Sequence, residues 1–237
     1  MHGIYEIAGV VVKINYNYNY TETFLKKYLY YGAEPFDVEI FITKEDVLFE
    51  KSIIKNEDLS VLEQSAILRK LVNVFLNDYN AVVFHGSSIK YKDKGFIFTA
   101  PSGTGKSTHT ALLKELLKGD VSYINDDKPI IRVIGEDVLV YGSPWNGKHF
   151  LGENVKAKLK AICFLARGEE NLIKKITPDK ALKYLFKQTV SYSDIKSANS
   201  LLGVLSSIID KVDFYVLYCT KDISAAKLSY EVMINED

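Results

Sequence analysis

Residues 95–108 read Gly-Phe-Ile-Phe-Thr-Ala-Pro-Ser-Gly-Thr-Gly-Lys-Ser-Thr. The first five of these residues predict a buried strand, and the good helix formers that follow predict a helix over residues 106–117. The loop between them matches the phosphate-loop pattern G-x-x-x-x-G-K-[ST] at Gly105, Lys106 and Ser107, with Ala100 where the first glycine is expected. A strand, a glycine-rich turn and a helix in this order predict a binding site for a nucleoside triphosphate.

The residue types of this loop explain how it would hold phosphates. Glycines allow the backbone to turn so that several N–H groups face one anion, and the following helix directs its positive end to the same place. Lys106 can reach the β- and γ-phosphates, and the Ser107 hydroxyl can ligate Mg²⁺. We therefore expect ATP with Mg²⁺. The expected cradle consists of Ser102, Gly103, Thr104, Gly105, Lys106, Ser107 and Thr108. The alternative is a glycine-rich turn that only caps a helix.

An acidic pair, Asp126 and Asp127, follows a predicted strand over residues 121–124. Because this strand comes directly after the loop helix, we expect the pair at the same sheet edge as the loop. Adjacent residues of a strand face opposite ways, so one carboxylate could serve a metal ion while the other meets the acceptor. A solvated Asp-Asp turn is the alternative.

His85 and Arg167 are two further candidates. His85 ends a predicted strand over residues 81–84, and Gly86 beside it permits a close backbone approach. Arg167 follows an apolar strand over residues 159–165 and could supply positive charge to a transferred phosphoryl group. The plainer alternatives are a hydrogen-bonded histidine at a strand end and an ordinary surface arginine.

The segment of residues 141–150, Tyr-Gly-Ser-Pro-Trp-Asn-Gly-Lys-His-Phe, predicts a loop because glycine, proline and asparagine punctuate it. Its Trp145, Lys148 and His149 are candidates for contact with an acceptor. A turn with one anchoring aromatic side chain would explain the same sequence.

Elsewhere the pattern predicts an α/β chain, α+β overall, in two parts: a small unit over residues 1–80 and a catalytic domain over residues 81–237. In the first part we expect a strand at 7–14, prolonged by the alternating run 15–20, a helix at 21–31, a strand at 36–42, and a helix from the capping box Ser60–Glu63 to about residue 77. In the second we expect strands at 88–91, 129–134, 138–141 and 214–219, helices at 179–188 and 195–211, and a last helix capped by Asp222.

Composition narrows the class of protein. Thirty basic and thirty acidic residues cancel, so no overall field attracts nucleic acid or an anionic membrane. Cys163 and Cys219 lie in apolar runs and predict buried thiols in a reducing compartment. The first residues lack a signal-peptide pattern, and no apolar run reaches the length of a membrane span. We therefore expect a cytoplasmic protein.

The order of His85-Gly-Ser-Ser, a hairpin, the phosphate loop and Asn125-Asp126-Asp127 resembles the HPr kinase/phosphorylase and phosphoenolpyruvate carboxykinase group. The resemblance covers about residues 81–237, and most specifically 83–130. It implies a phosphoenolpyruvate carboxykinase/HPr kinase-like P-loop core. It also implies that Ser107 and Asp127 hold the metal, that Asp126 takes the proton of the acceptor hydroxyl, and that His85 lies near the metal or the γ-phosphate.

Two departures from that group limit what the resemblance implies. The arginines that bind the carboxykinase substrate have no match here, and residues 141–150 differ from the glycine-rich signature of the HPr kinases. The chain as a whole most resembles HPr-kinase-related bacterial proteins, some relatives of which phosphorylate a precursor peptide. We expect a kinase acting on Ser or Thr of a peptide or small protein. A small-molecule kinase on the same fold, or a nucleotide-binding regulatory module, stays open, as does the oligomeric state.

Overall fold

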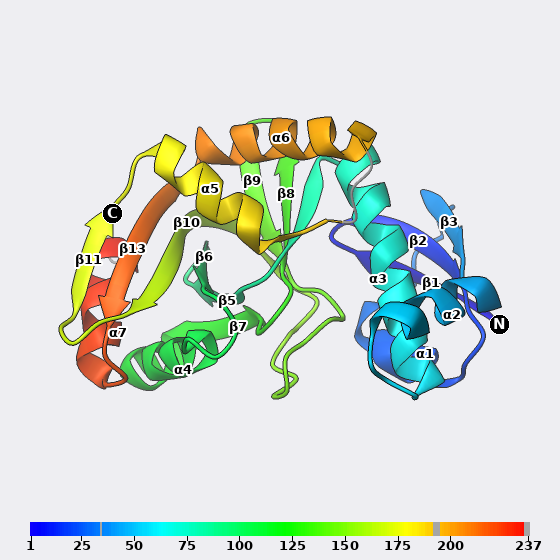
Figure 1. The fold of residues 1–237 in the computed structure, drawn as a ribbon, viewed down its shortest axis with the longest axis horizontal. Coiled ribbons are helices and arrows are strands. Elements are labelled where there is room, and N and C mark those ends of the chain that lie inside the picture. Colours follow the sequence, from blue (N-terminus) through cyan, green and yellow to red (C-terminus); the bar gives the residue numbers. More distant parts are fainter. Residues whose placement is uncertain (34, 192–194, 235–237) are drawn as a thin grey trace.

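A computed structural model of the chain describes residues 1–33, 35–191 and 195–234. The last three residues of the predicted catalytic domain, 235–237, therefore lie outside the described part. The described residues form a three-stranded sheet and a ten-stranded sheet. Figure 1 shows the small sheet at the N-terminal end of the molecule and the large sheet in the remainder, with helix α3 between them.

The small sheet begins with a tight hairpin. Strand β1 (His2–Ile7) pairs antiparallel with β2 (Val10–Asn15), and β3 (Val38–Phe41) lies parallel to β2. The turn residues Ala8 and Gly9 both have positive φ, at 55° and 71°, which is the backbone of a type I′ turn. The prediction of one strand over residues 7–14 was therefore wrong, because the chain reverses in the middle of that range.

The alternating run 15–20 does not prolong the strand as predicted. Strand β2 ends at Asn15, and helix α1 (Tyr20–Leu25) follows a short loop. The cause is the buried carboxylate of Glu63, which accepts hydrogen bonds from the Asn17 backbone N at 2.6 Å and from Thr21 Oγ1 at 2.6 Å. The same carboxylate accepts bonds from Asn17 Nδ2 and from the Tyr18 backbone N. The loop thus wraps around one acceptor.

The predicted helix over residues 21–31 is shorter than expected. A 3₁₀ turn, η1 (Lys26–Tyr28), follows α1, and the chain then leaves the helical path. The backbone N–H of Tyr30 donates to the carbonyl of Ile4, and Leu29 bridges to Tyr5. Pairing with the edge of β1 therefore replaces the last helical turn.

Two helices complete this unit, α2 (Lys44–Ile53) and α3 (Leu59–Asp78). A capping box that was not predicted begins α2, where Thr43 and Asp46 exchange side-chain and backbone hydrogen bonds. Helix α3 is capped by Asp58 instead of the predicted Ser60. The predicted box fails because Glu63 turns to the loop around Asn17, and α2 was not predicted at all.

Glu63→Gln tests this account of the N-terminal unit. An amide retains one acceptor oxygen and turns an NH₂ group toward the donors of the other oxygen, so two of the four hydrogen bonds lose their acceptor. We expect the free energy of unfolding to fall by about 2–3 kcal/mol. Denaturant titration measures this change. Glu57→Gln, an exposed change of the same kind that removes only a surface ion pair with Lys51, should change stability by less than about 1 kcal/mol. A Glu63→Gln variant as stable as the wild type would contradict the account.

The large sheet contains the strands that were predicted around the phosphate loop. They are β4 (Ala81–Phe84), β5 (Ser87–Tyr91), β6 (Lys94–Thr99), β7 (Val121–Asn125), β8 (Ile130–Ile134), β9 (Asp137–Tyr141), β10 (Lys156–Arg167) and β13 (Asp213–Cys219). The hairpins β5–β6 and β8–β9 are confirmed. Two short strands were missed, β11 (Leu172–Lys175), which pairs with β13, and β12 (Thr189–Val190), which pairs with β4.

Strand direction brings the ends of several strands to one edge of this sheet. Strands β6, β10 and β13 run parallel. Strand β5 is antiparallel to both β6 and β7, so β7 points the same way as β6. The segments that follow residues 99, 125, 167 and 219 therefore leave the sheet at the same edge.

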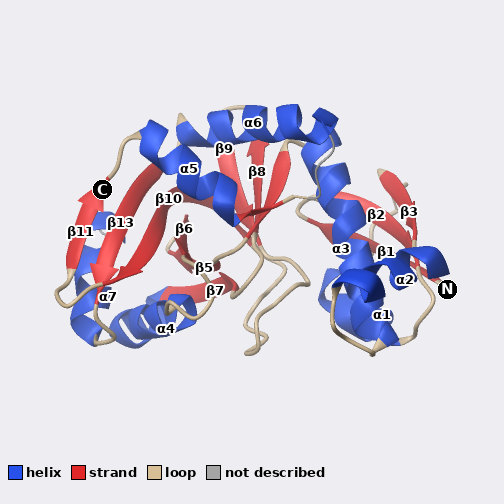
Figure 2. Cartoon of the chain, in the orientation of Figure 1, coloured by secondary structure: helices blue, strands red, loops and turns tan. Residues whose placement is uncertain are grey.

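Helices cover both faces of the large sheet, as Figure 2 shows. Helices α4 (Lys106–Leu117) and α7 (Ile223–Ser229) pack on one face, and α5 (Pro178–Gln188) and α6 (Ile195–Ile209) on the other. Asp222 caps α7 as predicted. Cys163 is buried and Cys219 half-buried, both as free thiols, so the second is less enclosed than predicted. No helix in the described part of the chain could span a membrane.

The two sheets share a hydrophobic core. Val12 and Leu71 of the N-terminal unit belong to the same buried cluster as Val83 and Ile130 of the large sheet. Arg132 adds two hydrogen bonds, from Nη1 to the carbonyls of the β1–β2 turn at 2.9 and 3.0 Å. The N-terminal unit is thus held against one end of the large sheet by apolar packing and by the half-buried side chain of Arg132.

His109 makes the packing of α4 dependent on pH. Its ring lies 4.7 Å from that of Phe98, its Nε2 lies 3.0 Å from Ser229 Oγ, and burial lowers its pKa from 6.5 to about 4. The unfolded chain therefore takes up the proton first as the pH falls. We expect His109 to contribute full stability above pH 6.5 and to lose about 3 kcal/mol of it between pH 6.5 and pH 4.

The difference in unfolding free energy between the wild type and His109→Gln, measured across this pH range, isolates the effect from other titrating groups. Glutamine stays neutral, so the wild type should lose stability relative to the variant as the pH falls. A difference that does not change with pH would contradict the assignment.

Candidate functional site

A cleft of about 680 Å³ lies at the edge where β6 and β7 end. Its walls come from the phosphate loop, the start of α4, the acidic pair and the loop after β9. The lining residues are His85, Ser102, Gly103, Gly105, Lys106, Ser107, Thr108, Ala111, Asp126, Asp127, Gly147, Lys148 and His149. Most of the predicted site residues therefore meet in one cavity. Thr104, Trp145 and Arg167 are outside this lining.

The backbone of the phosphate loop is bent at its glycines. Gly103 and Gly105 have φ values of 76° and 120°, which disfavour any side chain. Ala100 has no positive φ, so alanine in place of the first glycine of the pattern costs no strain. Gly105 precedes α4 without any side-chain cap, so the first N–H groups of this helix face the cleft without a capping partner.

Lys106 is buried and held by its own loop. Its Nζ donates to the carbonyl of Ala100 at 3.0 Å, and only 9% of the residue is exposed. Burial lowers the pKa of Lys106, while the nearby carboxylate of Asp127 opposes that shift. The Lys106 side chain is therefore a preorganised positive charge next to the loop.

Arg167 reaches the same loop from the end of β10. Its Nη2 donates to the carbonyl of Gly103 at 3.1 Å. Strand β10, which is far from the phosphate loop in the sequence, thus places a second positively charged side chain beside that loop. The sequence analysis proposed Arg167 from its place after an apolar strand, but this contact with the loop could not be foreseen.

The acidic pair lies in a bend after β7, because that strand ends at Asn125. The expectation that the pair would face opposite sides of a strand was wrong. Asn125 sets the bend, since its Oδ1 accepts from the backbone N of Asp127 at 2.8 Å and its Nδ2 donates to the Ser143 carbonyl at 3.0 Å. The sequence analysis did not give Asn125 this role, although asparagine is a common turn former.

Asp126 is almost completely buried, with 4% of the residue exposed. Its Oδ1 accepts a hydrogen bond from the Gly147 backbone N at 2.8 Å. Its Oδ2 is also buried and has no hydrogen-bond partner among the described residues. A buried carboxylate oxygen without a partner is costly, so it points to a group that binds there during function.

Asp127 is tied to a histidine and a lysine. Its Oδ1 lies 3.3 Å from His85 Nε2, and its Oδ2 accepts from Lys128 Nζ. Burial alone would raise the pKa of Asp127, but the hydrogen bonds from His85 and Lys128 outweigh it and lower the pKa to about 2. Asp127 is therefore a carboxylate throughout the neutral range, as a metal ligand has to be.

His85 is fixed at its backbone as well as at its ring. Its N–H donates to the Gln188 carbonyl at 2.7 Å, and its own carbonyl accepts from Thr99 Oγ1 at 2.6 Å. Next to it, the Gly86 N–H donates to the Asp127 carbonyl at 2.9 Å. These bonds tie the ends of β4, β6, β7 and α5 together around the cleft.

The loop of residues 141–150 divides its predicted acceptor residues between two sides. Lys148 and His149 are exposed and line the cleft. Trp145 turns away, because its Nε1 donates to the Gln64 carbonyl of α3 at 3.1 Å and its ring packs edge-on to Phe24 at 6.0 Å. The tryptophan anchors the loop to the N-terminal unit.

No protein-family model and no curated protein sequence matches the chain. Among solved structures, the Hpr(Ser) kinase/phosphatase from Coxiella burnetii is similar with a TM-score of 0.36 and 11% sequence identity, over 63% of this chain and 93% of that one. Similarity at this level supports no functional assignment, which therefore depends on the geometry of the cleft.

Arg167→Ala should weaken the binding of a non-hydrolysable ATP analogue with Mg²⁺ by about fivefold, because the loop loses a charge-assisted hydrogen bond. Isothermal titration calorimetry measures the change. Arg167→Lys keeps the charge and separates it from the hydrogen bond to Gly103. An alanine variant with wild-type affinity would show that Arg167 is an ordinary surface residue.

Proposed function

We propose that this protein is an ATP-dependent kinase that transfers the γ-phosphoryl group of ATP to a hydroxyl, on Ser or Thr of a peptide or small protein. One observation carries the proposal: the buried Oδ2 of Asp126, which has no hydrogen-bond partner among the described residues, belongs to a residue that lines the same cleft as the phosphate loop. A phosphate loop alone indicates nucleotide binding. A carboxylate beside it adds a group that can activate an acceptor.

The loop fits a triphosphate. A Cβ built on Gly103 or Gly105 would meet no described atom within 4 Å, so the space beside these two glycines is open. The uncapped start of α4 and the charges of Lys106 and Arg167 all favour an anion there. The binding of the phosphates would thus use backbone N–H groups first and the two cations second.

The oxygen atoms of Ser107 and Asp127 suit Mg²⁺, a hard cation that prefers oxygen ligands. When bound, Mg²⁺ would neutralise the charge on the β- and γ-phosphates. His85 holds one oxygen of Asp127 and thereby orients the carboxylate. Asp127 is consequently the metal-side residue of the pair, and Asp126 is the residue left for the acceptor.

In the transfer step, the acceptor hydroxyl displaces the part of the cleft wall that covers Asp126 Oδ2 and donates a hydrogen bond to this oxygen. Gly147 holds the other oxygen, so the carboxylate cannot turn away. As the hydroxyl oxygen bonds to the γ-phosphorus, its proton passes to Asp126 and the bond to the β-phosphate oxygen breaks, which leaves ADP. Lys106 and Arg167 balance the negative charge of the moving phosphoryl group.

A small-molecule kinase is the second candidate, and one observation favours it. A cavity of about 640 Å³ lies on the N-terminal side of the loop at Trp145, with Phe24, Tyr28 and Lys128 in its lining. The buried Tyr28 hydroxyl has no hydrogen-bond partner among the described residues. An aromatic metabolite with a hydroxyl group would suit this cavity, and transfer to such compounds but to no peptide would favour this candidate.

Asp126→Asn tests the proposed function. The amide cannot accept the proton, so phosphoryl transfer from labelled ATP to serine-containing peptides should fall by at least about a hundredfold. Nucleotide binding should be retained, because Lys106 and the loop are untouched. Asp120→Asn, an exposed change of the same kind outside the cleft, is the matched control. Transfer by Asp126→Asn at the wild-type rate would exclude Asp126 as the base.

A further inference from the structure

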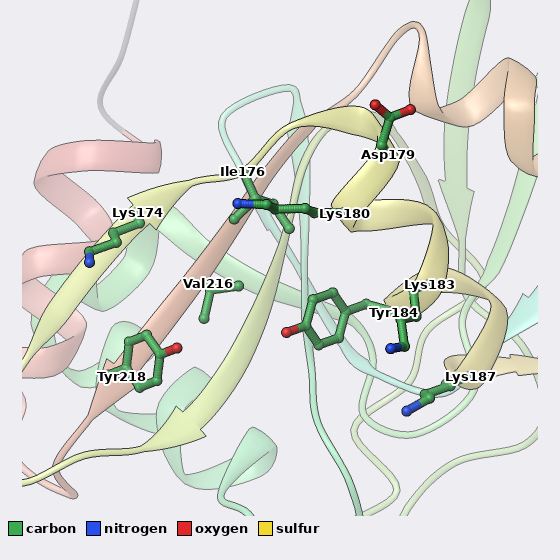
Figure 3. Close-up of a pocket in the computed structure, with 9 residues that line it drawn as sticks. All are labelled: Lys174, Ile176, Asp179, Lys180, Lys183, Tyr184, Lys187, Val216 and Tyr218. Carbon is green, nitrogen blue, oxygen red and sulfur yellow. The ribbon is translucent and has the colours of Figure 1, made fainter.

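A third cavity, of about 600 Å³, lies between α5 and the strands β11 and β13. Figure 3 shows its lining, with the hydroxyl groups of Tyr184 and Tyr218 turned toward the space between the helix and the strand. Ile176 and Val216 provide an apolar floor. Four lysines surround it, Lys174, Lys180, Lys183 and Lys187. We call this cavity the lysine groove.

The positive charge of the lysine groove is not neutralised by the described residues. Lys180, Lys183 and Lys187 follow helical spacing and therefore share one face of α5. None of the four lysines forms an ion pair with a described residue, whereas Lys175 next to the groove pairs with Asp213 at 2.6 Å. Asp179, in the first turn of α5, is an acidic residue in the lining. The groove therefore favours an anionic partner.

The lysine groove is lined by aromatic side chains as well as by charged ones. Tyr184 and Tyr218 are 44% and 43% exposed. The Tyr184 ring stacks on Phe164 at 4.9 Å between centroids, so it is held in place. Free phosphate would not use these rings or the apolar floor. A polypeptide that carries both acidic and apolar side chains would use both, because exposed tyrosines supply large contact area at low entropic cost.

The lysine groove and the cleft share no lining residue, but backbone contacts next to their linings connect them at two places. Beyond Lys187, the carbonyl of Gln188 accepts the hydrogen bond of the His85 backbone at 2.7 Å. On the strand side of the groove, Tyr218 pairs with Ala166 in the β10–β13 ladder, directly before Arg167, whose guanidinium contacts Gly103. A chain segment that extends from the groove past Lys187 would therefore pass the strand end at His85, which lines the cleft.

We propose that the lysine groove binds an acidic segment of the acceptor polypeptide and so presents a neighbouring Ser or Thr to Asp126. The inference rests on the proposed function, because it assigns the acceptor of that reaction. It favours a peptide over nucleic acid, since the chain as a whole has no excess of positive charge.

Charge reversal in the groove tests this proposal. The probe is a fluorescein-labelled peptide in which glutamate alternates with leucine around a single serine, added with a non-hydrolysable ATP analogue. Lys183→Glu/Lys187→Glu should weaken its binding, measured by fluorescence anisotropy, by about tenfold or more. Lys44→Glu/Lys55→Glu changes the net charge equally at exposed lysines of the N-terminal unit and should bind like the wild type. Added salt should weaken only binding that depends on the groove.

Three results would contradict the groove proposal. The two charge-reversed variants could lose equal peptide affinity, a peptide with glutamine in place of glutamate could bind as tightly, or an oligonucleotide or anionic vesicle could bind more tightly than the peptide. Lys183→Gln/Lys187→Gln removes the positive charges without introducing glutamates that would repel the acidic peptide, and it should also weaken binding. Circular dichroism checks that this variant is folded.

Transfer assays separate this proposal from the kinase function. Asp126→Asn should bind the peptide like the wild type while losing transfer. If charge reversal leaves both the rate and the KM for the peptide unchanged, the groove proposal fails and the kinase function stands. If the wild type binds the peptide but transfers no phosphoryl group to any hydroxyl, the kinase function fails, and with it the acceptor role of the groove.

Discussion

Strands β6, β7, β10 and β13 all direct their carboxyl ends to one edge of the large sheet. Strand direction follows from backbone hydrogen bonding, and the buried strands hold it rigidly. It places the phosphate loop, the acidic pair and Arg167 around one cleft, although these segments lie far apart in the sequence. Every functional residue discussed above depends on this shared edge, because none of the segments could form the site alone.

The phosphate loop could be predicted because its signal is local: two glycines, a lysine and a serine between a strand and a helix. The N-terminal unit could not, because its form depends on distant partners. Glu63 looks like part of a capping box until Asn17 and Thr21 occupy its carboxylate. Similarly, the acidic pair was predicted, but the bend that orients it comes from Asn125 and Ser143, which meet only in the folded chain.

The cleft and the lysine groove differ in the charge of their linings. In the cleft, Asp127 is held by His85 and Lys128, and Asp126 keeps one buried oxygen free of described partners. In the lysine groove, positive side chains surround an apolar floor. The first arrangement suits a metal-bound triphosphate and a hydroxyl, and the second suits an acidic chain. Under the two proposals, the acceptor would be a polypeptide with its acidic segment in the groove and its hydroxyl in the cleft.

The central claim is that the triphosphate lies on residues 100–108 with its γ-phosphate next to Asp126. A crystal structure with a non-hydrolysable ATP analogue and Mg²⁺ tests it most directly. The account predicts β- and γ-phosphates at Lys106 and Ser107, Mg²⁺ on the side of Asp127, and Asp126 Oδ2 facing the γ-phosphate across a space that a hydroxyl can enter. A nucleotide bound elsewhere, or a γ-phosphate directed away from Asp126, would contradict it.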